Sequence, residues 1–68
     1  MKLGRTGSND LTIREREVAK LAVYGYTNAE IAERLHISLN TVKQALWHAM
    51  NKTGCKKRQE LIKYLRSF

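Results

Sequence analysis

Hydrophobic residues return every three or four positions along most of this chain, which is the spacing of one face of an α-helix. The pattern is clearest between residues 39 and 53, where apolar side chains gather on one face and larger polar ones on the other. The apolar face carries Val42, Ala45, Leu46, Ala49 and Met50, and the opposite face carries Lys43, Gln44, Trp47, His48 and Asn51. This stretch is therefore predicted to be a helix that buries one side and presents the other.

Capping signals mark the ends of the predicted helices. Thr12 with Glu15 and Thr27 with Glu30 have the T-x-x-E spacing of a capping box, and Ser38 is a good N-cap for a third helix. There is no proline, and no alternation typical of a strand appears. The chain is predicted to be all-α, with helices at about 12–24, 28–35, 39–53 and 57–67 and with stops at Gly25 and Gly54.

The second and third predicted helices are joined by a very short turn. Ile31, Ala32 and Leu35 form the inner face of the second helix, and the small Ala32 allows the next helix to cross close by. His36 and Ile37 make the turn. This order is that of a helix-turn-helix, in which the second helix of the pair enters the DNA major groove.

The length of 68 residues indicates one domain with a small core, predicted over residues 11–68. Residues 1–10 mix glycine, serine, asparagine and aspartate, and are predicted to be a flexible arm. The longest apolar run is far below the roughly 20 residues that span a bilayer, and no secretion leader is recognisable. With a single cysteine, Cys55, the chain is expected to be cytoplasmic and not to bind a membrane.

The net charge of +7 is unevenly distributed. Residues 1–35 carry six basic and five acidic side chains, a net charge of +1, whereas residues 36–68 carry seven basic and one acidic, a net charge of +6. The positive field therefore lies on the half that contains the presented helix, as expected for a partner such as double-stranded DNA. The alternative is that these charges are simply solvated.

Candidate chemistry other than binding is sparse. His36, His48 and Cys55 do not have the spacing of a metal site, so no metal or other cofactor is expected. No phosphate-binding loop and no nucleophile with a placed base stands out, so the chain is not expected to be an enzyme.

The fourth predicted helix has a wider apolar arc than one packing face requires. Part of this arc is predicted to form the interface of a homodimer, which would place two presented helices one DNA turn apart, roughly 34 Å. The alternative is that the whole arc fills the core of a single chain. The predicted interface residues are Leu61, Tyr64, Leu65 and Phe68.

An ordered set of residues resembles the LuxR-type helix-turn-helix domain. These residues include L-T-x-R-E-R-E-V from Leu11 to Val18, G-x-T-N-x-E-I-A from Gly25 to Ala32, Thr41-Val42-Lys43, Gly54, and Arg58 with Glu60. The match covers about residues 11–65 and is most similar to the short stand-alone members of the GerE kind, although an excised effector domain would look the same. The resemblance implies a four-helix, dimeric bacterial transcription regulator whose third helix reads the major groove.

The resemblance also implies which residues contact DNA. The positions matching base-reading residues are Lys43, Gln44 and Trp47. The indole of Trp47 either contacts the duplex or folds inward over the gap left by Ala45, where the family usually has a histidine. The positions matching contacts to the DNA backbone are Thr27, Asn28, Asn40, Thr41, Lys52 and Arg58. Three further backbone contacts are expected from the outward-facing His48 and Asn51 and from the basic Lys57.

Two rival functions use the same scaffold. One is a promoter-reading fragment resembling the fourth region of sigma factors, but the helix after Gly54 argues against it. The other is a protein-interaction module that binds RNA polymerase or another regulator. RNA polymerase is also a candidate second partner for the DNA-binding function.

Overall fold

The computed structural model describes residues 11–67, and within them it contains four helices and no strand. These are α1 (Ile13–Val23), α2 (Asn28–Leu35), α3 (Leu39–Thr53) and α4 (Arg58–Arg66). The all-α prediction is confirmed. The predicted bounds of the first and last helices were one residue too wide at each end, because the outermost residues are caps. The predicted arm, residues 1–10, lies outside the described residues.

Both predicted capping boxes are present. In α1 the Thr12 hydroxyl accepts a hydrogen bond from the Glu15 backbone N–H at 3.1 Å, and the Glu15 carboxylate accepts from the Thr12 N–H at 3.0 Å. Thr27 and Glu30 repeat this exchange at the start of α2, at 3.2 and 2.8 Å. Each box satisfies two backbone groups that a helix start would otherwise leave unpaired.

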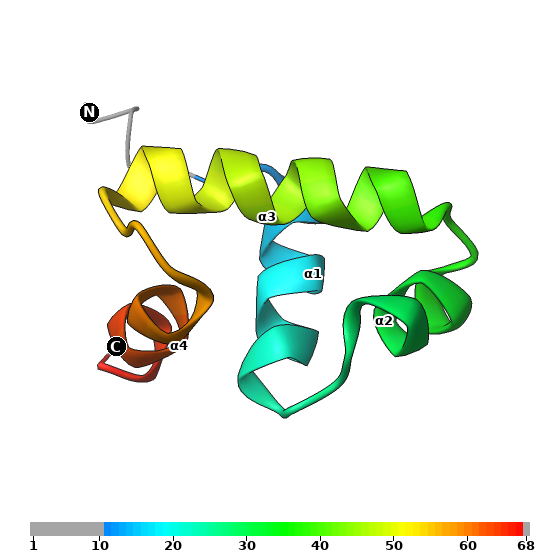
Figure 1. Ribbon diagram of the computed structural model, residues 1–68, viewed down its shortest axis with the longest axis horizontal. Coiled ribbons are helices and arrows are strands. Elements are labelled where there is room, and N and C mark those ends of the chain that lie inside the picture. Colours follow the sequence, from blue (N-terminus) through cyan, green and yellow to red (C-terminus); the bar gives the residue numbers. More distant parts are fainter. Residues whose placement is uncertain (1–10, 68) are drawn as a thin grey trace.

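The longest helix, α3, lies along one side of the molecule, and the other three helices lie beneath it (Figure 1). The central helix α1 packs against α2, α3 and α4. The helix-turn-helix pair α2–α3 is therefore supported from behind by α1. None of the helices in the described part of the chain is long and apolar enough to cross a membrane.

Small side chains make up much of the core. Ala45 and Ala49 on α3 and Ala22 on α1 are buried, which allows the backbones of these helices to approach closely. Most residues predicted for the inner faces of α2 and α3 are buried, which confirms these faces. They are Ile31, Ala32, Val42, Ala45, Leu46 and Ala49. The buried apolar core consists of Val18, Ala22, Ile31, Ala32, Val42, Ala45, Leu46, Ala49 and Leu61.

Leu61, one of the predicted residues of the dimer interface, lies in the core. Its side chain is completely buried among the core residues of its own chain, so a second chain has no access to it. Tyr64 and Leu65 are half-buried, and Phe68 lies outside the described residues. For Leu61 this burial favours the alternative, that the apolar arc of α4 fills the core of a single chain.

The turn between α2 and α3 depends on a residue in the left-handed backbone conformation that is not glycine. His36 ends α2 in the left-handed conformation, with φ 57° and ψ 44°, and its backbone N–H donates to carbonyls of the last turn. This single residue reverses the chain direction before Ser38 begins α3. The predicted position of the turn is confirmed, but its left-handed geometry was not predicted.

Candidate nucleic-acid interface

The start of α3 is fixed by hydroxyl groups. Ser38 Oγ accepts from the Thr41 backbone N–H at 3.1 Å and lies 2.8 Å from Thr41 Oγ1. Thr41, an expected phosphate contact, is thus already hydrogen-bonded within the cap, although one hydroxyl can serve two partners. These hydrogen bonds hold the N-terminal part of α3, which carries Asn40 and Lys43, in a rigid conformation.

One continuous face of α3 is exposed over the length of the helix. Trp47 lies near its middle with 60% of its surface exposed, so the indole does not fold inward over Ala45. Its ring packs edge-on against the His48 ring at a centroid distance of 5.1 Å. Behind it, the Asn51 side chain donates to the Trp47 carbonyl at 3.0 Å. The exposed residues of this face are Asn40, Lys43, Gln44, Trp47, His48 and Asn51.

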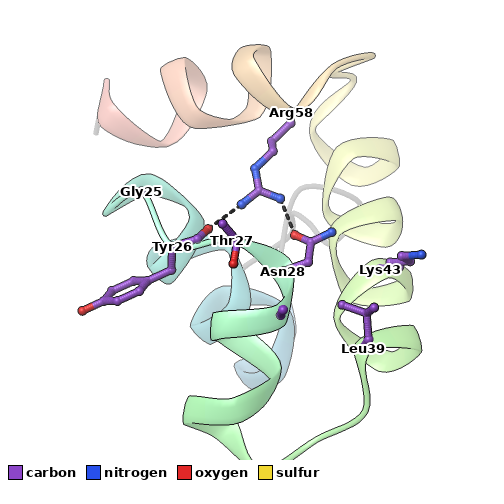
Figure 2. A pocket seen from close by; sticks show the side chains of 8 residues that line it. Gly25, Tyr26, Thr27, Asn28, Leu39, Lys43 and Arg58 are labelled. Carbon is purple, nitrogen blue, oxygen red and sulfur yellow. Dashed lines mark hydrogen bonds between the residues drawn. The ribbon is translucent and has the colours of Figure 1, made fainter.

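Arg58, at the start of α4, reaches across to the start of α2 (Figure 2). Its guanidinium donates through Nη1 to Asn28 Oδ1 and through Nη2 to the Tyr26 carbonyl, the latter at 2.8 Å. Thirty residues separate Arg58 from Asn28 in the sequence. The structure therefore brings together two of the expected backbone contacts and holds them in a fixed relative position.

Two hollows meet beside this network and open next to α3. Both are lined by Asn28, Lys43 and Arg58. The first extends along the α1–α2 loop to Thr27, and the second extends along α3 past Trp47. Two cationic side chains from different helices thus border the same depression beside the exposed face of α3. The remaining lining residues are Gly25, Tyr26, Ala29 and Leu39 for the first hollow and Leu46, Met50 and Leu61 for the second.

Lys56 and Lys57, the two lysines before α4, lie next to an acidic side chain in the first turn of that helix. Lys57 is the N-cap of α4, is exposed and makes no side-chain cap hydrogen bond. The backbone N–H of the neighbouring Lys56 donates to the Glu60 carboxylate at 2.8 Å. An acidic side chain therefore occupies the first turn of α4, where negative charge complements the helix dipole.

Lys52, another expected backbone contact, already has an acidic partner in its own chain. Its ammonium lies 2.7 Å from the Glu15 carboxylate on α1. Glu15 itself is buried, with only 8% of its residue surface exposed. Burial raises the pKa of the Glu15 carboxyl, but the hydrogen bonds from Lys52 and the Thr12 N–H, with the charges of Lys52 and His48, outweigh it and lower the pKa.

Among the described residues there is no group of three or more histidine, cysteine, aspartate or glutamate side chains that could hold a metal ion. The exposed face of α3, the Arg58–Asn28 network and the neighbouring hollows are instead features of a binding surface.

Comparison with known proteins agrees with this geometry. Residues 9–65 match the model of the family described as bacterial regulatory proteins, luxR family. The chain is 44% identical over 54 residues to the oxygen regulatory protein NreC of Staphylococcus aureus, covering 79% of this chain and 25% of NreC. Solved structures of the Salmonella typhimurium RcsB response regulator, described in terms of conformational dynamism for DNA interaction, superpose with a TM-score of 0.85. Their identities are 32% and 34%, over 91% of this chain and 30% of the RcsB chain.

The fold and the exposed face of α3 define a helix-turn-helix domain of the kind found in DNA-binding transcription regulators. The chain belongs to the luxR family of bacterial regulatory proteins. It spans about a quarter of the length of NreC and about a third of that of RcsB.

Proposed function

We propose that this domain binds double-stranded DNA in a sequence-specific manner as a homodimer in the bacterial cytoplasm, and that it regulates transcription there. The observation that carries the proposal is the continuous exposed face of α3, which is rigidly capped at Ser38 and backed by α1. A helix of this kind fits the major groove, where each base pair presents a distinct set of donors and acceptors.

In this proposal three side chains of α3 read bases. Lys43, near the N-terminus of α3, donates to guanine O6 and N7, and Gln44 pairs with adenine N6 and N7. The exposed indole of Trp47 contacts a thymine methyl group or a deoxyribose. Phosphate contacts position the domain without carrying sequence information.

The phosphate contacts come from three sources. The start of α2 and the Arg58 network supply Thr27, Asn28 and Arg58, and the N-cap of α4 supplies Lys57. The contacts from α3 are Asn40, Thr41, His48 and Asn51. Arg58 and Asn28 are held in place before DNA arrives, so little side-chain entropy is lost when they bind.

A second candidate function is favoured by the same exposed indole. Trp47 borders a hollow that is lined mainly by apolar side chains, and exposed tryptophan is typical of protein-interaction surfaces. In this alternative the domain binds RNA polymerase or another regulator through α3.

Selection from a pool of random duplexes at about 150 mM salt tests the proposed function against this alternative. A sequence reader enriches one motif over successive rounds, and a homodimer enriches a motif with two-fold symmetry. Retention of duplexes without enrichment, or no retention at all, would exclude sequence-specific binding and favour the protein-interaction module.

A further inference from the structure

The most buried ion pair described in the molecule joins helices that are far apart in the sequence. Lys52 Nζ lies 2.7 Å from Glu15 Oε1, across 37 positions, with side-chain exposures of only 30% and 11%. The other described ion pair, Arg14 with Glu17, is 3.4 Å long and about half exposed on both sides. Solvent and salt therefore screen the Glu15–Lys52 pair much less than the Arg14–Glu17 pair.

The acceptor of this pair is fixed before Lys52 reaches it. Glu15 Oε1 also accepts the Thr12 backbone N–H at 3.0 Å, as part of the capping box of α1. Moving the carboxylate away would break the cap, and removing the Lys52 charge would leave a largely buried carboxylate without its cation, which is costly. Lys52 is thus anchored to a rigid point at the N-terminus of α1.

Lys52 leaves α3 in a direction well away from those of Lys43 and Trp47. Nine positions separate Lys43 from Lys52, which is about two and a half turns at 3.6 residues per turn, so their side chains leave opposite sides of α3. Lys52 lies on the flank that faces α1, next to the buried Ala45 and Ala49. The ion pair therefore links α1 to the side of α3 that packs against it.

We infer that Lys52 is a positioning residue, held by Glu15, which sets how α3 is carried on α1, and that it does not supply a phosphate contact. This inference rests on the proposed DNA-binding function. The resemblance to the LuxR-type domain implies that Lys52 contacts the DNA backbone, whereas the structure gives its charge a partner within the same chain. With the pair intact, Lys43 and Trp47 are presented at a fixed tilt relative to the rest of the domain.

The test measures binding of each variant of the full chain to its selected duplex and to a scrambled duplex of about 20 base pairs over a range of salt concentrations. Lys52→Met should leave the slope of log K against log salt on the scrambled duplex unchanged, whereas Lys43→Met should flatten it by up to about 0.9 if Lys43 meets a phosphate there. Lys52→Met and Glu15→Gln should each reduce the preference for the selected duplex by about tenfold, and the double variant by no more than either.

Matched controls separate positioning from loss of charge. Glu17→Gln removes an equal charge from the exposed side of the same helix and should leave the preference unchanged, as should Lys20→Met for the loss of a lysine. Lys52→Arg keeps the ion pair and should retain most of the preference.

The inference is overturned if Lys52→Met flattens the salt slope by about one unit, because Lys52 would then release a counterion from DNA. It is equally overturned if the effects of Glu15→Gln and Lys52→Met on urea-unfolding midpoints are simply additive, a measurement that needs no DNA. A parent chain that binds neither duplex would refute the proposed function. In that case the effects of Glu15→Gln, Lys52→Met and the double variant on the urea-unfolding midpoint would alone decide whether the ion pair positions α3.

Discussion

At the scale of single residues, two left-handed backbone positions set the ends of the helix-turn-helix. Gly54 ends α3 with φ 78°, where glycine has no steric penalty, and His36 ends α2 with φ 57° despite carrying a Cβ atom. An L-residue in this conformation costs about 1 kcal/mol or more relative to glycine. The turn before α3 therefore carries local backbone strain, whereas the end of α3 at Gly54 does not.

Substitutions at these two positions should change stability in opposite directions. His36→Gly should raise the free energy of unfolding by about 1 kcal/mol, and Gly54→Ala should lower it by about the same amount. A Cβ at Gly54 would meet no atom within 4 Å, so the loss there comes from the backbone conformation alone. Urea titration followed by circular dichroism measures both. A loss of stability in His36→Gly would mean that the imidazole makes a contribution larger than the backbone strain.

In the proposed function, Lys43 is the residue on which recognition of the DNA sequence depends most. It is exposed on α3 beside Arg58 and borders both hollows. Lys43→Ala should cost about 1–3 kcal/mol on the selected duplex and much less on a scrambled one, because the loss of a base contact is specific to sequence. Fluorescence anisotropy on the two duplexes measures this difference. Equal losses on both would assign Lys43 to phosphate.

The Glu15 carboxyl makes stability depend on pH. The pKa of Glu15 is lower in the folded chain than in the unfolded one. Its contribution to the free energy of unfolding is therefore complete at pH values above the pKa of the unfolded chain, and it is lost as the pH falls through the pKa of the folded chain. The free energy of unfolding should therefore decrease as pH is lowered below about 4.5, and Glu15→Gln should make this decrease shallower.

Lys52→Met provides the complementary measurement. Without the ammonium, burial still raises the pKa of Glu15 while its strongest hydrogen-bonding partner is gone, so the pKa should be lowered less and the free energy of unfolding should fall less steeply as the pH is lowered. A variant whose stability falls with pH as steeply as that of the parent would show that the Lys52 partner does not cause the shift. His48, whose charge also lowers the pKa of Glu15, is left unchanged in both variants.

At the scale of the helices, α4 is joined to α2 by one side chain. Arg58 makes two hydrogen bonds that link the first turn of α4 to Asn28 and to the Tyr26 carbonyl (Figure 2). The planar guanidinium presents both donors at once, which the ammonium of lysine does not do in the same geometry. The start of α2 is thereby held against the rest of the domain.

Arg58→Lys should therefore not be conservative. We expect a loss of about 1 kcal/mol in the free energy of unfolding and weaker DNA binding, because the start of α2 is no longer held. Arg66→Lys, the same change at the exposed end of α4, is the matched control and should have little effect. Equal stability of the two variants would show that the Arg58 bonds contribute nothing net.

At the scale of the whole molecule, the amount of apolar surface left on α4 limits the proposed homodimer. With Leu61 in the core, the described residues of the predicted interface are Tyr64 and Leu65, both half-buried. A dimer through α4 would therefore be small and favoured by DNA, which holds both chains on one two-fold site.

Tyr64→Glu should shift the sedimentation equilibrium toward monomer and reduce cooperative binding to a two-fold site, because a buried carboxylate would disfavour the interface. The matched change Tyr24→Glu, at an exposed position on α1, should leave the equilibrium unchanged. Circular dichroism of both variants shows whether they remain folded. A parent that is monomeric both free and on DNA would exclude the homodimer.

Local chemistry in the sequence determined the helices and their faces. The threonine–glutamate boxes, Ser38 and Gly54 act within one helical turn, so their pattern predicts α1 to α4 to within a residue. The exposed face of α3 follows from the same short-range periodicity. These features depend on spacing along the chain and not on how the helices are packed together.

Only the tertiary structure decided which residues of separate helices meet. Glu15 lies close to Lys52, Arg58 lies close to Asn28, and Leu61 is in the core, because the packing of α1 against α3 and α4 brings distant positions together. A side chain at the edge of an apolar stripe is buried or exposed according to how the neighbouring helix crosses it. Periodicity does not contain that angle, and for this reason neither the contact between Glu15 and Lys52 nor the burial of Leu61 could be read from the spacing of residues along the chain.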